Sequence, residues 1–258
     1  MIQKIMRRRV VKFLSFMSVI GLLTYCSNTS KPPEVIQIVT TADYAPFGYK
    51  DKHGELTGFD VELIKMIMKY LKMEFSIEEL TFDEVLSAVE GARADIGMGG
   101  LAITPDREEK FEFSHPYVKS PQALVVSADN PAVDIHGLNP KTLLIQKGAS
   151  YPQMLKKLMG MYPEASIVEL KDIHHAIAEF KSNNTPHTVI VIDNAVAQEL
   201  FKEMPELNIK VIGLQEEGLD IGFAIPHGKG HLRRKINQAL KALSPEIKQL
   251  KDKYGIER

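Results

Sequence analysis

From residue 35 onward, short runs rich in β-branched residues alternate with longer segments in which apolar residues recur at helical spacing. The short runs have the composition of buried strands. They lie at residues 35–39, 75–77, 95–98, 122–128, 142–146, 166–170, 188–192, 209–214 and 221–225. Because strands and helices that alternate along a chain form parallel sheets with covering helices, the pattern predicts an α/β fold with a mainly parallel sheet.

The helical segments carry their own starting signals. In residues 60–71, Asp60 precedes apolar positions at helical spacing and is the expected N-cap. Thr104 and Pro105 place a hydroxyl N-cap before a proline at the first helical position. The other helices are expected at residues 82–90, 151–160, 172–182, 194–203 and 231–254, the last with a break near Ser244-Pro245.

Residues 1–26 have the layout of a secretory signal peptide. A basic stretch without any acidic residue is followed by an apolar run at residues 13–23. Since a spanning helix needs about 20 apolar residues, this run is too short to cross a membrane. The folded part is therefore expected to be exported and soluble.

The chain's single cysteine, Cys26, ends this leader. The stretch Leu23-Thr24-Tyr25-Cys26 resembles a bacterial lipobox, in which the cysteine is lipidated, although Tyr25 replaces the usual small residue. We favour a lipoprotein signal; a plain signal peptide, or an uncleaved anchor with an incidental cysteine, is the alternative. Residues 27–34 are polar and proline-rich, as in a tether.

Composition narrows the classes of protein. The 258 residues are 44% hydrophobic and 25% charged, which are ordinary globular values for one large domain or two smaller ones. One cysteine excludes a disulfide framework and a cysteine-rich zinc site. The net charge of −1 argues against a general nucleic-acid binder. This charge is unevenly distributed along the chain, because residues 1–26 have a net charge of +5 and the remaining residues have a net charge of −6.

Common catalytic motifs are missing from the sequence. The glycine-rich stretch 97–100 lacks the Lys-Ser/Thr of a phosphate loop and the spacing of a dinucleotide loop, and there is no G-x-S-x-G elbow. His174 and His175 are adjacent and face different sides of a helix, so we expect no metal and no cofactor. Two features fit a binding site instead. Glycines after a strand let the backbone approach a ligand, and Arg107 near a helix start can receive a carboxylate.

Several stretches resemble the type II periplasmic solute-binding proteins for polar amino acids, solute-binding protein family 3. The matching stretches follow one another in order: residues 44–47, 54–61, 95–107, 113–117, 145–150, 191–197 and 221–225. The resemblance covers nearly the whole chain after residue 34. It implies two α/β lobes with a ligand cleft between them and two crossover strands.

The same resemblance implies where the chain passes between lobes. The crossings are expected near residues 119–122 and 214–219. Lobe 1 then comprises residues 35–119 plus 220–258, and lobe 2 comprises residues 120–219 with the hinge segments. Such a discontinuous lobe accounts for the lack of a single visible linker.

Each expected ligand-binding residue follows from this resemblance. Tyr44 and Phe82 match the aromatic pair that sandwiches the ligand side chain, although core packing is the alternative for Phe82. Arg107 matches the clamp on the ligand α-carboxylate. Asp193 matches the acid that pairs with the α-amino group, and it is also a candidate N-cap for the following helix. The backbone completes the expected site at Gly99, Gly100, Ala102 and Ser150.

Departures from the family pattern concern the ligand side chain. Thr41 stands where binders of basic amino acids often have an acid, and Gln146 stands where some relatives have a lysine. Both fit a polar neutral side chain about as well as a basic one, and both are included among the expected ligand-binding residues. Ala102 replaces a hydroxyl residue, and His115 replaces a common Asp. The acids Asp43, Glu216 and Glu217 are the remaining candidates for a cation site.

The resemblance implies an exported protein, periplasmic or membrane-anchored, that binds a free polar or basic L-amino acid by lobe closure. It delivers this amino acid to the permease of an ABC importer, catalyses no reaction and is expected to be a monomer. The alternative is an exported cyclohexadienyl or arogenate dehydratase on the same fold, which needs an acid placed for proton transfer. A sensory role without transport is a third possibility; a fused receptor is disfavoured because no membrane or signalling segment follows residue 258.

Overall fold

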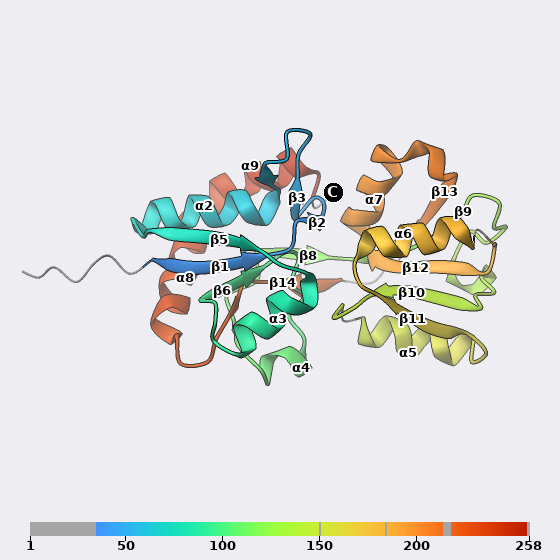
Figure 1. Ribbon diagram of the computed structural model, residues 1–258, viewed down its shortest axis with the longest axis horizontal. Helices are drawn as coiled ribbons and strands as arrows, with labels where there is room; N and C mark the ends of the chain where they lie inside the picture. The colour runs from blue at the N-terminus through green and yellow to red at the C-terminus, as the bar shows by residue number, and fades with distance from the viewer. Residues whose placement is uncertain (1–34, 150, 184, 214–217, 257–258) are drawn as a thin grey trace, which may run out of the picture. The chain divides into compact units, whose positions relative to one another are not determined.

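Two five-stranded sheets organise the chain, each with helices on both faces (Figure 1). The computed structural model describes residues 35–149, 151–183, 185–213 and 218–256. Residues from Val35 onward group into one compact unit. We call the part of this unit built around the first sheet lobe 1, and the part built around the second sheet lobe 2.

The sheet of lobe 1 has the strand order β5-β1-β6-β15-β7. Its strands are β1 (Ile36–Thr40), β5 (Phe75–Glu79), β6 (Ile96–Met98), β7 (Glu112–Phe113) and β15 (Ala224–Ile225). The first three are parallel, with Ile38 opposite Ile77 on one side and Ile96 on the other. β15 runs antiparallel to both β6 and β7.

The sheet of lobe 2 repeats this plan in the order β11-β10-β12-β9-β13. Its strands are β9 (Gln122–Ser127), β10 (Thr142–Gln146), β11 (Ser166–Leu170), β12 (Thr188–Asp193) and β13 (Ile209–Gly213). Strands β11, β10 and β12 are parallel, whereas β9 is antiparallel to β12 and β13.

Two short paired strands link the sheets. β8 (Val118–Ser120) lies in the sequence between β7 and β9, and β14 (Leu219–Ile221) lies between β13 and β15. They pair antiparallel, with Leu219 opposite Ser120. A small sheet of β2 (Asp43–Tyr44), β3 (Gly48–Lys50) and β4 (Leu56–Thr57) precedes the first long helix; it was not among the predicted elements.

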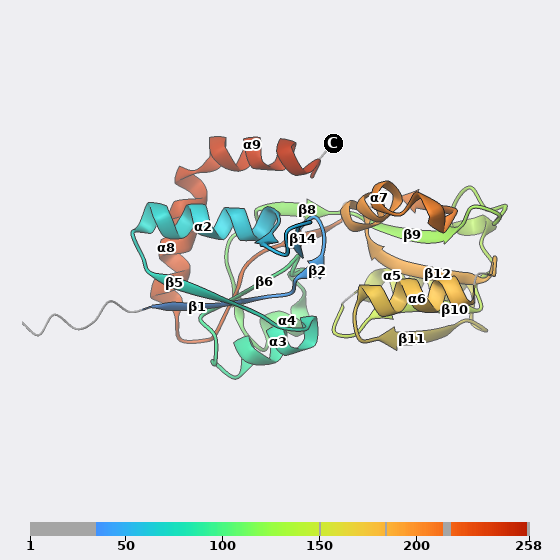
Figure 2. The ribbon, with the colours of Figure 1, turned by 45° about the horizontal axis from the view of Figure 1, so that its top comes forward.

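Helices cover both faces of each sheet (Figures 1 and 2). In lobe 1, α2 (Phe59–Leu71) packs with α8 (Gly230–Ala242) and α9 (Ser244–Tyr254), and α3 (Phe82–Glu90) packs on β1 and β6. Strand alternation divides the core accordingly, because Ile36 and Ile38 join the cluster of α2 and Val39 joins that of α3. The remaining helices are α4 (Pro105–Glu108), α5 (Pro152–Met161), α6 (Ile173–Ser182), α7 (Asn194–Glu203) and the short 3-10 helices η1 (Ile135–Gly137) and η2 (Pro205–Leu207).

Each sheet is mixed: four strands run in one direction, in agreement with the mainly parallel sheet predicted, and one strand that the sequence does not distinguish is reversed. The reversed strand is β15 in lobe 1 and β9 in lobe 2. β9 follows β8 and β15 follows β14 without an intervening helix. Parallel neighbours need a long crossover, usually a helix, so strands that arrive directly from the linking ribbon enter their sheets antiparallel. The pattern of apolar residues cannot distinguish these two arrangements.

Two local expectations also change. The predicted strand at 221–225 is two strands, β14 and β15, interrupted at Gly222-Phe223 where the chain leaves the linking ribbon. Asp60 is not the N-cap of α2, because the cap position is Gly58. The carboxylate of Asp60 is buried and instead accepts hydrogen bonds from the backbone of Gly99 and Gly100.

Candidate functional site

A small cavity lies where residues from both lobes meet. Its lining residues come from loops and element ends near the carboxyl ends of the parallel strands: Tyr44, Phe82, Gly100, Ala102, Arg107, Gln146, Ala149, Tyr151 and Asp193. Ligands of open α/β sheets bind at this edge. The cavity measures about 10 Å³, room for about one water molecule and less than an amino acid occupies.

Arg107 carries the buried positive charge of the site. The residue is 6% exposed, and the two terminal nitrogens of its guanidinium donate to backbone carbonyls, one to Ala102 at 2.7 Å and one to Gly148 of lobe 2 at 2.9 Å. The guanidinium carbon lies 5.6 Å from the centre of the Phe82 ring, a cation–π distance. Burial lowers the pKa of Arg107, but a guanidinium stays protonated in proteins. The site therefore presents a fixed cation with a planar set of donors.

The glycine loop beside Arg107 is held from behind by Asp60. The Asp60 carboxylate accepts hydrogen bonds from the backbone N–H groups of Gly99 at 2.9 Å and Gly100 at 2.8 Å. Both glycines have left-handed φ values, +120° and +70°, and a Cβ at Gly100 would lie 3.3 Å from Tyr44. Glycine is therefore required here for both the backbone conformation and the close contact. Burial raises the pKa of Asp60 to about 6, although the two N–H groups lower it.

Asp193 supplies the negative charge, at the end of β12. It occupies the N-cap position of α7, but its side chain makes no capping hydrogen bond. Instead its Oδ2 accepts the hydroxyl of Tyr44 at 2.5 Å, and the Tyr151 hydroxyl lies 3.5 Å away. Burial raises the pKa of Asp193, while the Tyr44 hydrogen bond and the charge of Arg107 lower it. Asp193 therefore stands at the cap position considered from the sequence, but its side chain does not cap the helix.

Aromatic rings and one amide complete the cavity. The rings of Tyr44 and Phe82 are tilted by 41° with centres 6.4 Å apart. Phe82 also belongs to the apolar core under α3, so it combines both roles considered for it. Gln146 is 6% exposed, and its Nε2 has no hydrogen-bond partner in the described part of the chain. Such a buried donor is costly unless a ligand or water pairs with it.

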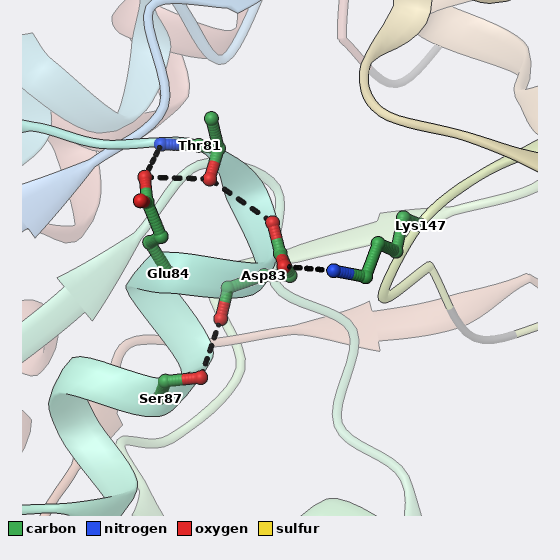
Figure 3. Close-up of polar contacts among 5 residues, drawn as sticks. All are labelled: Thr81, Asp83, Glu84, Ser87 and Lys147. Carbon is green, nitrogen blue, oxygen red and sulfur yellow. Dashed lines mark hydrogen bonds and ion pairs between the residues drawn. The ribbon is translucent and has the colours of Figure 1, made fainter.

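An ion pair joins the lobes next to this cavity (Figure 3). Lys147 Nζ, from the loop after β10, lies 2.6 Å from Asp83 Oδ2 in the first turn of α3. Asp83 also accepts the Thr81 hydroxyl at 3.0 Å, and Thr81 forms a capping box with Glu84. Asp83 and Lys147 directly follow the cavity residues Phe82 and Gln146 in the sequence.

The structure brings together most of the residues expected from the sequence. Seven line the cavity: Tyr44, Phe82, Gly100, Ala102, Arg107, Gln146 and Asp193. Thr41 and Gly99 do not; they pack against each other behind the loop, and the Thr41 hydroxyl donates to Asp43. Asp43 instead lines a larger opening of about 720 Å³ together with His174 and Glu199. Ser150, Cys26, Glu216 and Glu217 lie outside the described residues.

Sequence reasoning missed Tyr151 and the function of Asp60. The sequence pattern predicts only that a helix starts at Tyr151 and that Asp60 caps a helix. The order Tyr151-Pro152 does predict a helix start, but not the direction of the ring.

Two further features are absent from the described ranges. No group of three or more His, Cys, Asp or Glu side chains there is placed to hold a metal ion. Within the same ranges, no helix combines the length and the hydropathy needed to cross a membrane.

Comparison with known proteins gives one matching family over nearly all of the folded chain. Residues 36–257 match the model of the bacterial extracellular solute-binding proteins, family 3. The arginine-binding extracellular protein ArtP of Bacillus subtilis (strain 168) is 28% identical over 239 residues, covering 90% of this chain and 92% of the relative.

Solved structures show the same similarity. An ancestral arginine-binding protein, determined with glutamine and with arginine, superposes with a TM-score of 0.78 at 30% identity, covering 85% of this chain and 97% of the other. The ancestral amino acid-binding protein AncCDT-1, described as a precursor of cyclohexadienyl dehydratase, superposes with a TM-score of 0.73 at 30% identity and covers 85% and 95%. The two-lobe type II periplasmic-binding fold expected from the sequence is thereby confirmed.

Proposed function

Because this chain belongs to the bacterial extracellular solute-binding proteins, family 3, we propose that it binds a free polar or basic L-amino acid and delivers it to an ABC importer. Its fold and its cavity both support this proposal. No bond of the amino acid is made or broken in this function.

The observation that carries the proposal is the pair of opposite charges in one buried cavity. Arg107 offers a planar donor set to a carboxylate, and Asp193 offers an acceptor to an ammonium group. An α-amino acid carries both groups on one carbon. Since buried charges are costly without partners, a zwitterion is the ligand whose charges complement both residues.

We assign the ligand side chain to the aromatic pair and the amide of Gln146. Tyr44 and Phe82 can hold aliphatic carbons between their rings, and the unpaired Gln146 Nε2 can donate to a side-chain carbonyl. The ancestral relative was solved with both glutamine and arginine, in agreement with a polar or basic side chain. Asp43 does not line the cavity, and its partner Thr41 lies behind the glycine loop.

Binding requires the two lobes to open and close. The cavity is too small for an amino acid to enter while the lobes are in contact. We assign lobe 1 to residues 35–119 plus 220–258 and lobe 2 to residues 120–219, with the paired strands β8 and β14 as the hinge. A ligand that contacts both lobes stabilises the closed form relative to the open one.

The second candidate function is a dehydratase on the same fold. The similarity to AncCDT-1, a precursor of such an enzyme, is the observation in its favour. Asp193 is the one carboxyl group among the described residues that line the cavity, and the binding function already uses it. Turnover of prephenate or arogenate by the purified protein would favour the enzyme.

We also propose that the chain is exported and held at the membrane by lipidation of Cys26. The family is described as extracellular, and residues 1–26 have the layout of a lipoprotein signal. Substituting Cys26→Ala should abolish membrane association and palmitate labelling in cells. Labelling that stays intact in this variant contradicts the proposal.

A thermal-shift screen tests the main function. The mature chain is heated with each standard L-amino acid, and with ornithine and citrulline, at millimolar concentration. A ligand that binds only the folded protein raises the melting temperature by mass action. The proposal predicts a shift for polar or basic amino acids, whereas no shift with any of them excludes it.

A further inference from the structure

Tyr151 is the polar side chain of the cavity lining that the proposed function leaves without a role. It occupies the N-cap position of α5, directly before Pro152, and its side chain is 5% exposed. Its ring belongs to the apolar cluster of lobe 2 that includes Leu143 and Met154. A ring packed in this way is held in place, so the position of its hydroxyl in the cavity is set by the core of lobe 2.

The hydroxyl of Tyr151 lies between two other polar groups. Its oxygen is 3.2 Å from the Tyr44 oxygen and 3.5 Å from Asp193 Oδ2. A tyrosine hydroxyl has one proton. Tyr44 directs its proton to Asp193 at 2.5 Å, so the proton between the two tyrosines must come from Tyr151. The oxygen of Tyr151 then keeps a lone pair as an acceptor for a further donor.

Both hydroxyls keep their protons in this arrangement. Burial, and next the negative charge of Asp193, raise the pKa of Tyr44 and that of Tyr151 well above the usual value of about 10. Tyr151 therefore acts as a neutral donor and acceptor at physiological pH.

A primary ammonium group needs several acceptors in one place, because it carries three N–H donors. Asp193 supplies carboxylate oxygens, but the Tyr44 oxygen already receives the Tyr151 proton. Position 102 on the lobe 1 side of the cavity is an alanine and offers no hydroxyl. The Ser120 hydroxyl also interacts with the Asp193 carboxylate and lowers its pKa, but Ser120 does not line the cavity. The Tyr151 oxygen, which does line it, is thus a free acceptor beside Asp193 on the cavity side.

We propose that Tyr151 is a further ligand-binding residue, whose hydroxyl oxygen accepts an N–H of the ligand's ammonium group beside Asp193 and so determines selectivity for a primary amine. This inference rests on the proposed function. An N-methylated amino acid has one N–H fewer and places a methyl group against one of these acceptors, so the site should reject it.

The test compares Tyr151→Phe with the unaltered mature chain by calorimetry. The probes are L-arginine, L-glutamine and their Nα-methyl derivatives. Loss of one hydrogen bond to a charged group should raise the Kd of L-arginine or L-glutamine by about 10-fold. The Kd of the methylated derivative should change by less than about 2-fold, because the bond is absent there. The preference for the primary amine, measured as the ratio of the two Kd values, should therefore fall by nearly the same factor of about 10.

Tyr162→Phe is the matched control. The Tyr162 hydroxyl donates to the Ile135 carbonyl at 2.7 Å, in lobe 2 but away from the cavity, so this variant loses a hydroxyl without touching the site. It should leave all Kd values and the preference unchanged. The ring remains in Tyr151→Phe, so the melting temperatures of both variants should lie close to that of the parent.

The outcomes separate the inference from the function on which it rests. If Tyr151→Phe weakens an amino acid and its Nα-methyl derivative equally, the preference for the primary amine is unchanged. This result overturns the assignment of Tyr151 and leaves the proposed function intact. If the unaltered chain binds none of the polar or basic L-amino acids of the thermal-shift screen, the proposed function fails, and the inference fails with it.

Discussion

The two lobes contribute to the cavity in different ways. In lobe 1, Asp60 fixes the loop of Gly99 and Gly100, and Arg107 is bonded to Ala102 of its own lobe. In lobe 2, the Gln146 amide nitrogen has no described partner, and the short hydrogen bond to Asp193 comes from Tyr44 of lobe 1. Lobe 1 thus fixes its half of the site mainly by bonds of its own, with one further bond from Arg107 to Gly148 of lobe 2. Asp193 of lobe 2, in contrast, receives its shortest bond from the other lobe.

This difference indicates an order of binding. A surface that is already fixed binds a ligand without an ordering cost, whereas unpaired groups gain most when a partner arrives. We therefore expect an amino acid to bind lobe 1 first through its carboxylate, and lobe 2 to close over its ammonium group and side chain.

The largest effect should come from the cation of lobe 1. Arg107→Ala removes the carboxylate partner and should weaken L-amino acids and their des-amino analogues alike, by at least about 100-fold in calorimetry. Arg233→Ala is the control, since Arg233 is half-buried, pairs with Glu112 in the same lobe and does not line the cavity. Retained affinity in Arg107→Ala contradicts the assignment of lobe 1 as the primary binding surface.

A smaller and selective effect is expected in lobe 2. Asp193→Asn removes the charge opposite the ammonium group and should weaken L-amino acids by about 30-fold. Analogues without the amino group lack this contact, so their Kd for Asp193→Asn should stay within about 2-fold of their Kd for the parent. Equal losses for both types of ligand would mean that Asp193 shapes the fold of lobe 2 and not the ammonium contact.

The support behind the lobe 1 loop can be tested by pH. The pKa of Asp60, about 6, is raised above the ordinary 3.8, so the folded protein holds this proton more tightly than the unfolded chain. The resulting contribution to stability is present in full below about pH 4 and is lost as the pH rises through 6. The parent should therefore gain stability relative to Asp60→Asn by about 2 kcal/mol when the pH falls from 7.5 to 4.5.

Urea unfolding of both chains at pH 4.5 and pH 7.5 measures this gain. The neutral amide at position 60 does not titrate, so other groups cancel in the difference between the two chains. A difference that stays constant with pH shows that the Asp60 carboxylate is not held buried behind the glycine loop.

The smallest effect concerns the ion pair between the lobes. Lys147 is 58% exposed and Asp83 is 31% exposed, and solvent screens exposed pairs of this kind, so that they contribute little. Lys147→Met should therefore raise Kd by about 1.4- to 5-fold, mainly through faster release, and high salt should remove the difference. Lys253→Met is the control, because its pair with Glu62 lies within lobe 1. A Kd that is unchanged at low salt excludes a contribution of the pair to closure.

Much of the fold could be predicted from the sequence, because its signals are local. Apolar periods of two and about 3.6 residues placed the strand at 142–146 and the helix at 194–203 at the bounds found. The opposite charges of Arg107 and Asp193 follow from their residue types, and the family resemblance predicted that both belong to one site. The antiparallel insertion of β9 and β15 was missed, because apolar patterns contain no information on strand direction.

Only the tertiary structure determined how the site is held. Asp60 bonds to a loop 39 residues further along the chain, and Tyr44 bonds to Asp193 at a separation of 149 residues. A helix or strand pattern specifies which face a residue occupies, but not which side chain from another lobe meets it. For the same reason Tyr151 was predicted only as a helix start, whereas in the folded chain its hydroxyl lies beside the acid of the site. The sequence alone thus determined the elements and the charges, and the packing of distant segments decided which polar groups share one buried space.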